Sequence, residues 1–280
     1  ISPDKTMSIP VSVDESEILS VSVGQSAIVS IDSINGEVFN GTVTEIDRAG
    51  TLRGHLRPEL AKELGINEAS FAAVGTHDTA SAVAAIPGTG SFAFCSSGTW
   101  SLFGVETDEP ILRDDVRSAN FSNEGTIQGG FRPLRNIMGL WLIQECRRDW
   151  IKAGHTYSWN EIVMEAEKAE PFRSIIDPDF GEFFAGGQMI EKIQSYCRNT
   201  DQPVPETVGQ VARCIYESLA LKYRWALERL EEIKGQRIDT LNIVGGGCQN
   251  ELLNQFAADS IDRPVVTAPI EGAAIGNLLA

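Results

Sequence analysis

An acidic residue flanked by polar side chains is the strongest chemical signal in this chain. Asp78 lies between the imidazole of His77 and the hydroxyl of Thr79, after an apolar run and before a stretch of small residues. A carboxylate in that setting can accept the proton of an alcohol as a general base. It can also cap the helix that the small residues predict, and the local sequence alone favours the cap.

A second polar loop, residues 96–102, contains a Ser-Ser-Gly-Thr turn. Gly98 permits a close backbone approach, and the hydroxyl of Thr99 can donate to a phosphate oxygen. The same residue types are common at the tip of a β-hairpin, and such a tip can also be a phosphate site. An acid that activates an alcohol, together with an anion-binding turn, predicts phosphoryl transfer to a sugar hydroxyl.

Three consecutive glycines, Gly245, Gly246 and Gly247, follow an apolar run and precede a predicted helix. At such a strand-to-helix junction the backbone can meet the phosphates and the adenosine of a nucleotide. The spacing is not G-x-G-x-x-G, so the sequence does not support a dinucleotide fingerprint. A tight turn without a ligand is the structural alternative.

The elements around these loops alternate between strands and helices. We expect strands over residues 92–95, 100–105, 241–244 and 265–266, and helices over 57–65, 78–85, 134–150, 206–234, 249–260 and 271–280. This order predicts an α/β domain. The helix over 134–150 would place the amides of Asn136 and Gln144 on one face, because they are just over two turns apart.

Four blocks together resemble the FGGY family of carbohydrate kinases. They are the two polar loops, the Asn-Ile-Met-Gly-Leu-Trp stretch at 136–141, and the glycine triplet with its neighbours at 243–250. The likeness runs from about Gly50 to Ala280. It implies an actin-like ATPase (ribonuclease H-like) fold that is truncated at its C-terminal end. It also implies ATP-dependent phosphorylation of a ketose, with Mg²⁺ as the metal.

The resemblance assigns roles to the candidate residues and reverses the local preference for a cap. The catalytic aspartate of the family falls on Asp78. The implied sugar contacts are His77, Asp78, Thr79 and Asn136. The implied ATP contacts are Gly98, Thr99, Gln144, Gly245, Gly246 and Gly247. In the family, the aspartate that organises Mg²⁺ belongs to an earlier phosphate loop, so no metal ligand is expected among these residues.

Residues 1–50 differ in sequence pattern from the rest of the chain. Polar and apolar residues alternate over 7–13, 27–31 and 38–46, and Asn35-Gly36 is a hairpin turn signal between the last two segments. This pattern predicts a small all-β segment. It resembles a β-barrel segment of periplasmic adaptor (membrane-fusion) proteins of efflux systems. The chain would then be composite, and a true fusion and an artificial join are both open.

The resemblances divide the chain into three expected parts. They are the all-β segment 1–50, the tail of an FGGY N-terminal lobe with the Asp78 loop over 51–87, and the C-terminal nucleotide-binding lobe over 88–280. The first phosphate loop of the family is not seen, and catalysis by positioning needs the whole site, so we expect weak turnover from this chain by itself. The alternatives are a kinase for another ketose or polyol, a nucleotide-binding module without turnover, and an adaptor fragment.

The charge of the chain limits its partners. Its 280 residues carry a formal net charge of −16 at pH 7, and Lys and Arg are scattered rather than gathered in a stripe. A nucleic-acid partner is therefore not expected. No apolar run is long enough to span a membrane. The expected partners are a sugar and ATP, which local donors must hold because the global charge repels an anion. The sequence does not indicate an oligomeric state.

The five cysteines form no C-x-x-C pair, so a zinc site is not expected. An odd number of widely spaced cysteines is typical of reduced thiols, which points to the cytoplasm. Cys197 and Cys214 flank a predicted loop between two helices and could meet in space. A crosslink between these two residues is the alternative to five free thiols.

Overall fold

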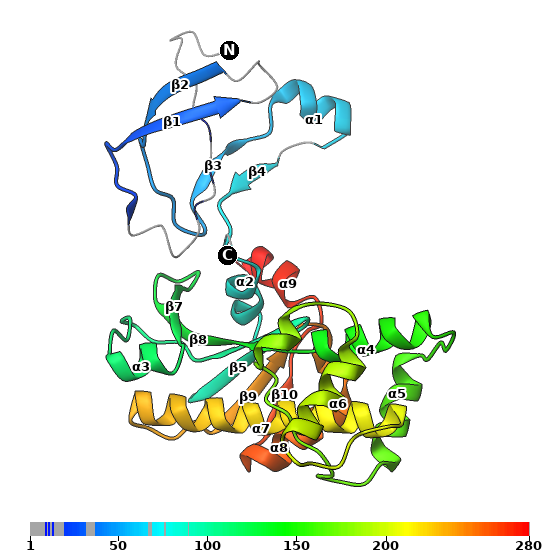
Figure 1. The fold of residues 1–280 in the computed structure, drawn as a ribbon. Helices are drawn as coiled ribbons and strands as arrows, with labels where there is room; N and C mark the ends of the chain where they lie inside the picture. Colours follow the sequence, from blue (N-terminus) through cyan, green and yellow to red (C-terminus); the bar gives the residue numbers. More distant parts are fainter. Residues whose placement is uncertain are drawn as a thin grey trace.

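The computed structural model describes residues 9, 11, 13, 20–31, 37–66, 69–75, 77–88 and 90–279. Most of the alternating segment 7–13, the Asn35-Gly36 turn and Thr76 of the first polar loop lie outside these residues. In Figure 1 the N-terminal strands and the first helix form a group above a larger α/β part.

The described residues before 76 form two antiparallel pairs of strands and one helix. The pairs are β1 (Ser26–Ile31) with β2 (Glu37–Thr42), as the sequence predicts, and β3 (Leu52–His55) with β4 (Ser70–Ala72). α1 (Pro58–Leu64) begins with a proline, whose fixed φ suits the first helical turn. Among the described residues of this part, Ala61 alone has a buried hydrophobic side chain, so its core is slight.

The larger part is built on a six-stranded sheet in the order β10-β9-β5-β6-β8-β7. Its strands are β5 (Phe92–Ser97), β6 (Trp100–Gly104), β7 (Ser122–Gly125), β8 (Phe131–Met138), β9 (Thr240–Val244) and β10 (Val265–Thr267). β5, β9 and β10 are parallel, whereas β5, β6, β8 and β7 follow one another in antiparallel pairs. The sheet therefore has parallel strands at one side and an antiparallel meander at the other.

Helices cover both faces of this sheet (Figure 1). α2 (Asp78–Ala84) and α9 (Gly272–Leu279) lie on one face, and α7 (Val208–Lys234) runs along the other. The remaining elements are α3 (Asp114–Ser118), α4 (Trp141–Lys152), α5 (Trp159–Lys168), α6 (Met189–Asn199) and α8 (Glu251–Ile261), with 3₁₀ turns η3 (Gly181–Phe184) and η4 (Gly246–Gln249). The predicted α/β domain is confirmed.

Alternation along β5 divides the core between the two faces of the sheet. Ala93 and Cys95 belong to the larger cluster, which includes the buried face of α7. Phe94 packs instead with Val83 and Ile86 on the α2 face. Successive side chains of a strand point to opposite faces, so a strand that is covered on both sides is apolar throughout. This is why the strand appears in the sequence as a continuous apolar run.

α7 is the long helix that the sequence predicts over 206–234. It begins with a capping box in which Thr207 and Gln210 satisfy each other's backbone N–H groups, and it ends at Gly235 in the left-handed region (φ +68). The hydroxyl of Tyr223 lies 2.7 Å from that of Ser101 on β6. This buried hydrogen bond fixes the centre of α7 against the strand that follows the Gly-Thr turn.

The predicted helix over 134–150 is wrong in its first part. Residues up to Met138 form β8, which pairs with β6 on one side and β7 on the other, and α4 begins only at Trp141. A Cβ on Gly139 would lie 2.7 Å from the backbone of Trp100, so this turn requires glycine. Sheet pairing overrides the helical periodicity, and Asn136 and Gln144 lie on a strand and a helix rather than on one helix.

Cys197 on α6 and Cys214 on α7 meet, as the sequence allows. The two side chains lie in the same buried hydrophobic cluster, yet both cysteines are free, as are Cys95, Cys146 and Cys248. The structure therefore has five thiols rather than a crosslink.

Asp179 connects the end of β8 to α7. Its carboxylate accepts hydrogen bonds from the Met138 N–H (2.9 Å) and Arg135 (2.8 Å), and it lies 3.0 Å from the ammonium of Lys222. Burial by itself would raise the pKa of Asp179, but these partners together outweigh burial and hold the pKa below its usual 3.8. The strand end that leads into α4 is thus held by charged contacts.

α2 and α9 pack backbone against backbone, because small residues line their interface. A Cβ on Gly276 would lie 1.7 Å from the carbonyl oxygen of Ser81. The Ser81 hydroxyl also donates to Asn277 Oδ1 (2.6 Å). The position of α2, and of the polar loop at its start, therefore depends on α9.

We predict that Gly276→Ala destabilises the protein by about 2 kcal/mol, because the added methyl group must push α9 away from Ser81. The better helix propensity of alanine offsets only about 1 kcal/mol of the strain. Urea unfolding measured by tryptophan fluorescence tests the prediction. Gly181→Ala is the matched control, since its Cβ meets no atom within 4 Å. Equal midpoints for the two variants would contradict the packing argument.

We predict that Asp179→Asn lowers the free energy of unfolding at pH 7 by roughly 2 kcal/mol, because it weakens hydrogen bonds to two cations. The folded pKa of Asp179 is depressed, so its carboxylate stabilises fully above the usual 3.8 and loses this contribution as the pH falls through the lower folded pKa. Unfolding measured across the acid range should show the gap between variant and parent closing below that value. A gap independent of pH would contradict the prediction.

Candidate functional site

Two of the candidate loops meet at one edge of the sheet. β5 and β9 are adjacent and parallel, with Ser96 opposite Val244, so their carboxyl ends coincide. The Gly98-Thr99 turn follows β5, and the glycine triplet follows β9. Open α/β sheets bind ligands outside the carboxyl ends of their parallel strands. The two loops that the sequence connected with phosphate therefore share the edge where a nucleotide is expected.

The glycine triplet packs directly on the end of β5. Gly245 has φ +84, and a Cβ there would lie 2.9 Å from the carbonyl oxygen of Ser97. A Cβ on Gly247 would lie 2.0 Å from the Ser97 hydroxyl oxygen, so no side chain fits at that position. Gly246, between them, is exposed and has open space around it. Two glycines thus serve the fold, and the third leaves its backbone accessible to a ligand.

Gln144 joins the same group through the Gly-Thr turn. The Leu140 N–H donates to the carbonyl of Gly98 (3.0 Å), and the Trp141 N–H donates to that of Thr99 (3.1 Å). One turn into α4, the Thr99 hydroxyl lies 3.4 Å from Gln144 Oε1. The Gly98 N–H donates within the hairpin to Trp100 (2.8 Å), so it is occupied there. Thr99 and Gln144, which bond each other, are therefore the polar side chains of this part of the site.

The acidic loop stands at the start of α2. Asp78 accepts a hydrogen bond from the Thr79 N–H (2.7 Å), so it does bond the helix terminus. Its side chain is nevertheless 86% exposed, and its carboxylate faces solvent rather than packed hydrocarbon. Thr79 is buried, with its hydroxyl 3.4 Å from Asp78, so it supports the acid more than it offers a surface of its own. Asp78 is the first residue of α2 and His77 is its N-cap, with no side-chain capping hydrogen bond, so the capping role that the local sequence favours for Asp78 is wrong.

Asn136 lies on the same face of the sheet as α2. Its neighbour Arg135 stacks on Trp225 of α7 (4.9 Å), so alternation places Asn136 on the opposite face together with Leu134, which packs against α2. β8 runs in the same direction as β5, so Asn136 is also near the edge that carries the Gly-Thr turn. Although the predicted helix is wrong, Asn136 thus shares a face with His77 and Asp78.

One neighbour of this loop was not anticipated from the sequence. Glu124 on β7 lies with its Oε2 3.9 Å from Nδ1 of His77, and Arg132 on β8 pairs with Glu124. No local pattern connects residues so distant along the chain. The one signal that could have drawn attention to this contact is the opposite charges of Glu124 and Arg132, on a short edge strand and the strand beside it.

The described residues offer no cluster for a metal ion. Within the part of the chain that the structure covers, no group of three or more His, Cys, Asp or Glu side chains converges. The Mg²⁺ that the family implies therefore has no ligand set among these residues. The glycine triplet, in contrast, leaves room for a ligand to approach its backbone, because a Cβ on Gly246 would meet no atom within 4 Å.

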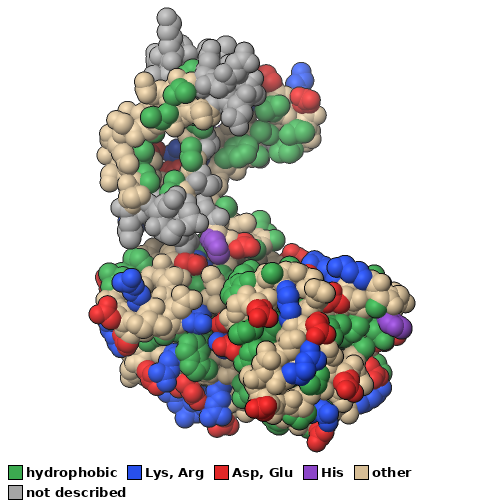
Figure 2. All heavy atoms as spheres, viewed as in Figure 1, with side chains coloured by type: hydrophobic (Ala, Val, Ile, Leu, Met, Phe, Trp, Pro, Cys, Tyr) green, Lys and Arg blue, Asp and Glu red, His purple; other side chains and the backbone are tan. Residues whose placement is uncertain are grey.

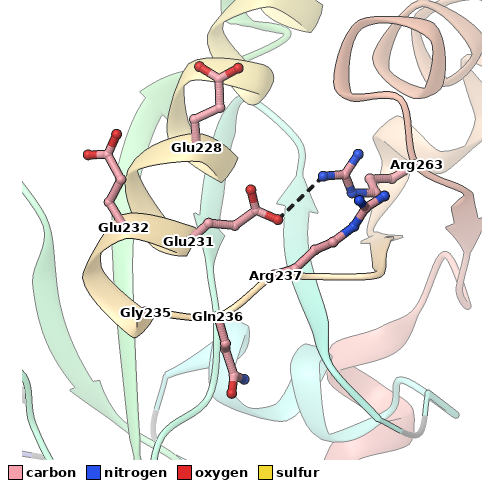
Figure 3. Close-up of a pocket in the computed structure, with 7 residues that line it drawn as sticks. All are labelled: Glu228, Glu231, Glu232, Gly235, Gln236, Arg237 and Arg263. Carbon is pink, nitrogen blue, oxygen red and sulfur yellow. Dashed lines mark ion pairs between the residues drawn. The ribbon is translucent and has the colours of Figure 1, made fainter.

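A hollow of about 590 Å³ lies elsewhere, at the C-terminal end of α7 (Figure 3). It is lined by Glu228, Glu231, Glu232, Gly235, Gln236, Arg237 and Arg263. Arg237 precedes β9 and Arg263 precedes β10, so the hollow is at the amino edge of the parallel strands. The glycine triplet is at the opposite edge, and the hollow is not part of the candidate site.

The surface in view mixes both signs of charge. Figure 2 shows acidic side chains interspersed with Lys and Arg over the larger part, without a broad basic patch on that face of the described residues. None of the helices in the described ranges combines the length and the apolar content needed to cross a bilayer.

Comparison with known proteins gives close sequence relatives. The rhamnulokinase of Bacteroides thetaiotaomicron is 49% identical over 227 residues, which cover 81% of this chain and 46% of the relative. The rhamnulokinase of Bacillus subtilis is 38% identical over 268 residues, 95% of this chain and 54% of the relative. The chain thus spans about half the length of these relatives.

The first fifty residues gain no support as an adaptor segment. The alignment with the Bacillus subtilis protein covers 95% of the chain, so it includes most of that region. The β1–β2 hairpin is present, but the likeness to periplasmic adaptor proteins is unsupported. The division of the chain at residues 50 and 87 stays a prediction.

Solved structures share the fold at low sequence identity. Xylulose kinase from Lactobacillus acidophilus superposes with a TM-score of 0.62 at 15% identity, over 84% of this chain and 47% of that one. Gluconate kinase from the same organism gives 0.60 at 18% identity, over 85% and 48%. These similarities confirm the predicted actin-like ATPase fold, present in part.

A domain family also matches, over residues 93–280, and it is described as the C-terminal domain of the FGGY family of carbohydrate kinases. The match contains the Gly-Thr turn, the glycine triplet, Asn136 and Gln144. It extends over more than half of the chain, and it agrees with the relatives and the fold. This chain belongs to the FGGY family of carbohydrate kinases.

Proposed function

We propose that this chain serves ATP-dependent phosphorylation of a ketose, L-rhamnulose, to give L-rhamnulose 1-phosphate. Two relatives at 49% and 38% identity are named rhamnulokinase, which supports this substrate. The observation that carries the proposal is the exposed carboxylate of Asp78, on the same face of the sheet as Asn136. The Gly-Thr turn and the glycine triplet, at the carboxyl ends of β5 and β9, would present ATP to it.

The chain's own residues suit the steps of this transfer. Asp78 would orient the acceptor hydroxyl and take its proton as the sugar oxygen bonds to the terminal phosphorus of ATP. The bond from that phosphorus to the bridging oxygen breaks, and ADP leaves with the electron pair. His77 and Asn136 would bind other hydroxyls of the sugar. Bound Mg²⁺ neutralises phosphate charge in such reactions.

A second candidate function is nucleotide binding without turnover. It is favoured by the described residues themselves, which provide loops for a nucleotide but no ligand set for Mg²⁺. A third, phosphorylation of another ketose or polyol, shares every element of the proposed mechanism. The first experiment below separates these functions, and it also measures whether turnover by this chain is weak.

We predict that Asp78→Asn lowers kcat for L-rhamnulose at least about 100-fold, the usual contribution of a general base. Stability should change little, because the side chain is exposed. A coupled assay of ADP release with MgATP and L-rhamnulose measures the effect. Asp114→Asn is the matched control, since Asp114 is also an exposed first residue of a short helix.

Three results would contradict the proposed function. An Asp78→Asn variant with the parental rate would exclude the carboxylate as the base. A parent chain that binds ATP calorimetrically, but releases no ADP when L-rhamnulose is added, would favour the second candidate. Faster turnover with another ketose or a polyol would favour the third.

We predict that alanine at Gly247 affects stability, whereas alanine at Gly246 affects ATP binding. Gly247→Ala should destabilise the protein by about 1–3 kcal/mol, because its methyl group meets Ser97. Gly246→Ala should leave stability unchanged but weaken ATP binding about tenfold, because its methyl group would occupy the space of the ligand. Thermal unfolding and calorimetric titration with ATP separate the two. Unchanged ATP affinity in Gly246→Ala would remove the triplet from the nucleotide site.

A further inference from the structure

We propose that Glu124 is a positioning residue for His77, which it holds in the tautomer that carries hydrogen on Nδ1, so that Nε2 accepts a hydrogen bond from a sugar hydroxyl. The inference deepens the proposed function and rests on it for the role of the sugar. Its structural half, the link between Glu124 and His77, does not depend on any substrate.

Contacts within its own hairpin help to hold the side chain of Glu124. It lies on β7 directly opposite Arg132 of β8, and the two side chains form an ion pair at 3.3 Å. Arg132 is fully buried, and its Nε donates to the carbonyl of Gly125 (2.9 Å). Glu106 also faces this guanidinium; burial raises the pKa of Glu106, and Arg132 partly offsets the rise. The hairpin thus contributes to the orientation of Glu124 through a buried guanidinium.

Nδ1 of His77 lies in a strongly acidic setting. It is 3.9 Å from Glu124 Oε2 and 3.7 Å from Asp78 Oδ1. Neither separation is a direct hydrogen bond, and Nδ1 is buried without a hydrogen-bond partner. A lone pair on Nδ1 would face two carboxylates, which disfavours it, whereas an N–H there is attracted to both. A small rotation of either side chain would complete the hydrogen bond.

The tautomer decides what His77 can do for a substrate. A neutral imidazole with hydrogen on Nδ1 has an accepting Nε2, and the partner of one ring nitrogen determines the state of the other. Asp78 accepts the proton of the reacting hydroxyl, so a second acceptor beside it would orient a neighbouring hydroxyl of the sugar. Glu124 would then affect sugar binding without touching the sugar.

The test begins with nitrogen NMR of the imidazoles in the substrate-free chain, at a pH where exposed histidines are neutral. The sequence has three histidines, and His77→Gln assigns the signal of interest. We expect His77 to be mainly in the Nδ1–H form. Glu124→Gln keeps the shape but removes the charge, and it should shift the ratio toward Nε2–H by about tenfold. Glu124→Asp, which keeps the charge, should restore part of the Nδ1–H form.

Glu109→Gln is the matched control, because Glu109 is an exposed carboxylate with no contact to His77 among the ion pairs of the described residues. It should leave the signals of His77 unchanged. A His77 ring that is mainly Nε2–H or doubly protonated in the parent would overturn the proposal. Equal spectra for Glu124→Gln and the parent would overturn it as well.

Kinetics test the connection to the sugar separately. Glu124→Gln should raise KM for L-rhamnulose about threefold to tenfold while KM for ATP stays constant, a pattern that general loss of structure does not produce. An unchanged KM for the sugar would overturn the role in substrate binding. If the spectra behave as expected but the parent shows no turnover, the contact between Glu124 and His77 stands and the proposed function fails.

Discussion

The parallel pairing of β5 with β9 is the interaction on which the rest of the structure depends. It places Ser97, at the end of one strand, against the glycine triplet that follows the other, so closely that Gly247 has no room for a Cβ. Two loops that are far apart in the sequence thereby become neighbours. The nucleotide site that we propose at this edge depends on strand pairing as much as on the loop residues, because each loop by itself is only a turn.

α2 is held in a similar way on the face of the sheet opposite α7. Phe94 of β5 packs beneath it with Val83, and Ser81 contacts the backbone of Gly276 on α9. A helix of small residues has little side-chain area to bury, so close backbone contact must replace it. The small residues that give α2 little area to bury are thus also the residues that let it pack closely against α9. Asp78, at the start of α2, stays exposed.

Much of this arrangement is visible in the sequence, and the failures have physical causes. Thr207, the apolar spacing that follows it and Gly235 predict α7, because capping and burial act within one helix. The strand β8 is not predictable in this way, since residues 131–138 are strand only because β6 and β7 pair with them. For the same reason the contact of Glu124 with His77, which is far away along the chain, has no local signature.

Asp78 combines a hydrogen bond to its own helix with an exposed carboxylate. The carboxylate accepts a hydrogen bond from the Thr79 N–H within α2, where Asp78 is the first helical residue rather than the cap, and this bond limits its rotation. A base that is held in place loses less entropy when a substrate hydroxyl arrives. Its high exposure leaves it accessible in a protein whose net charge of −16 gives an anionic ligand no attraction at long range. Local hydrogen bonds must therefore provide the orientation that global electrostatics cannot.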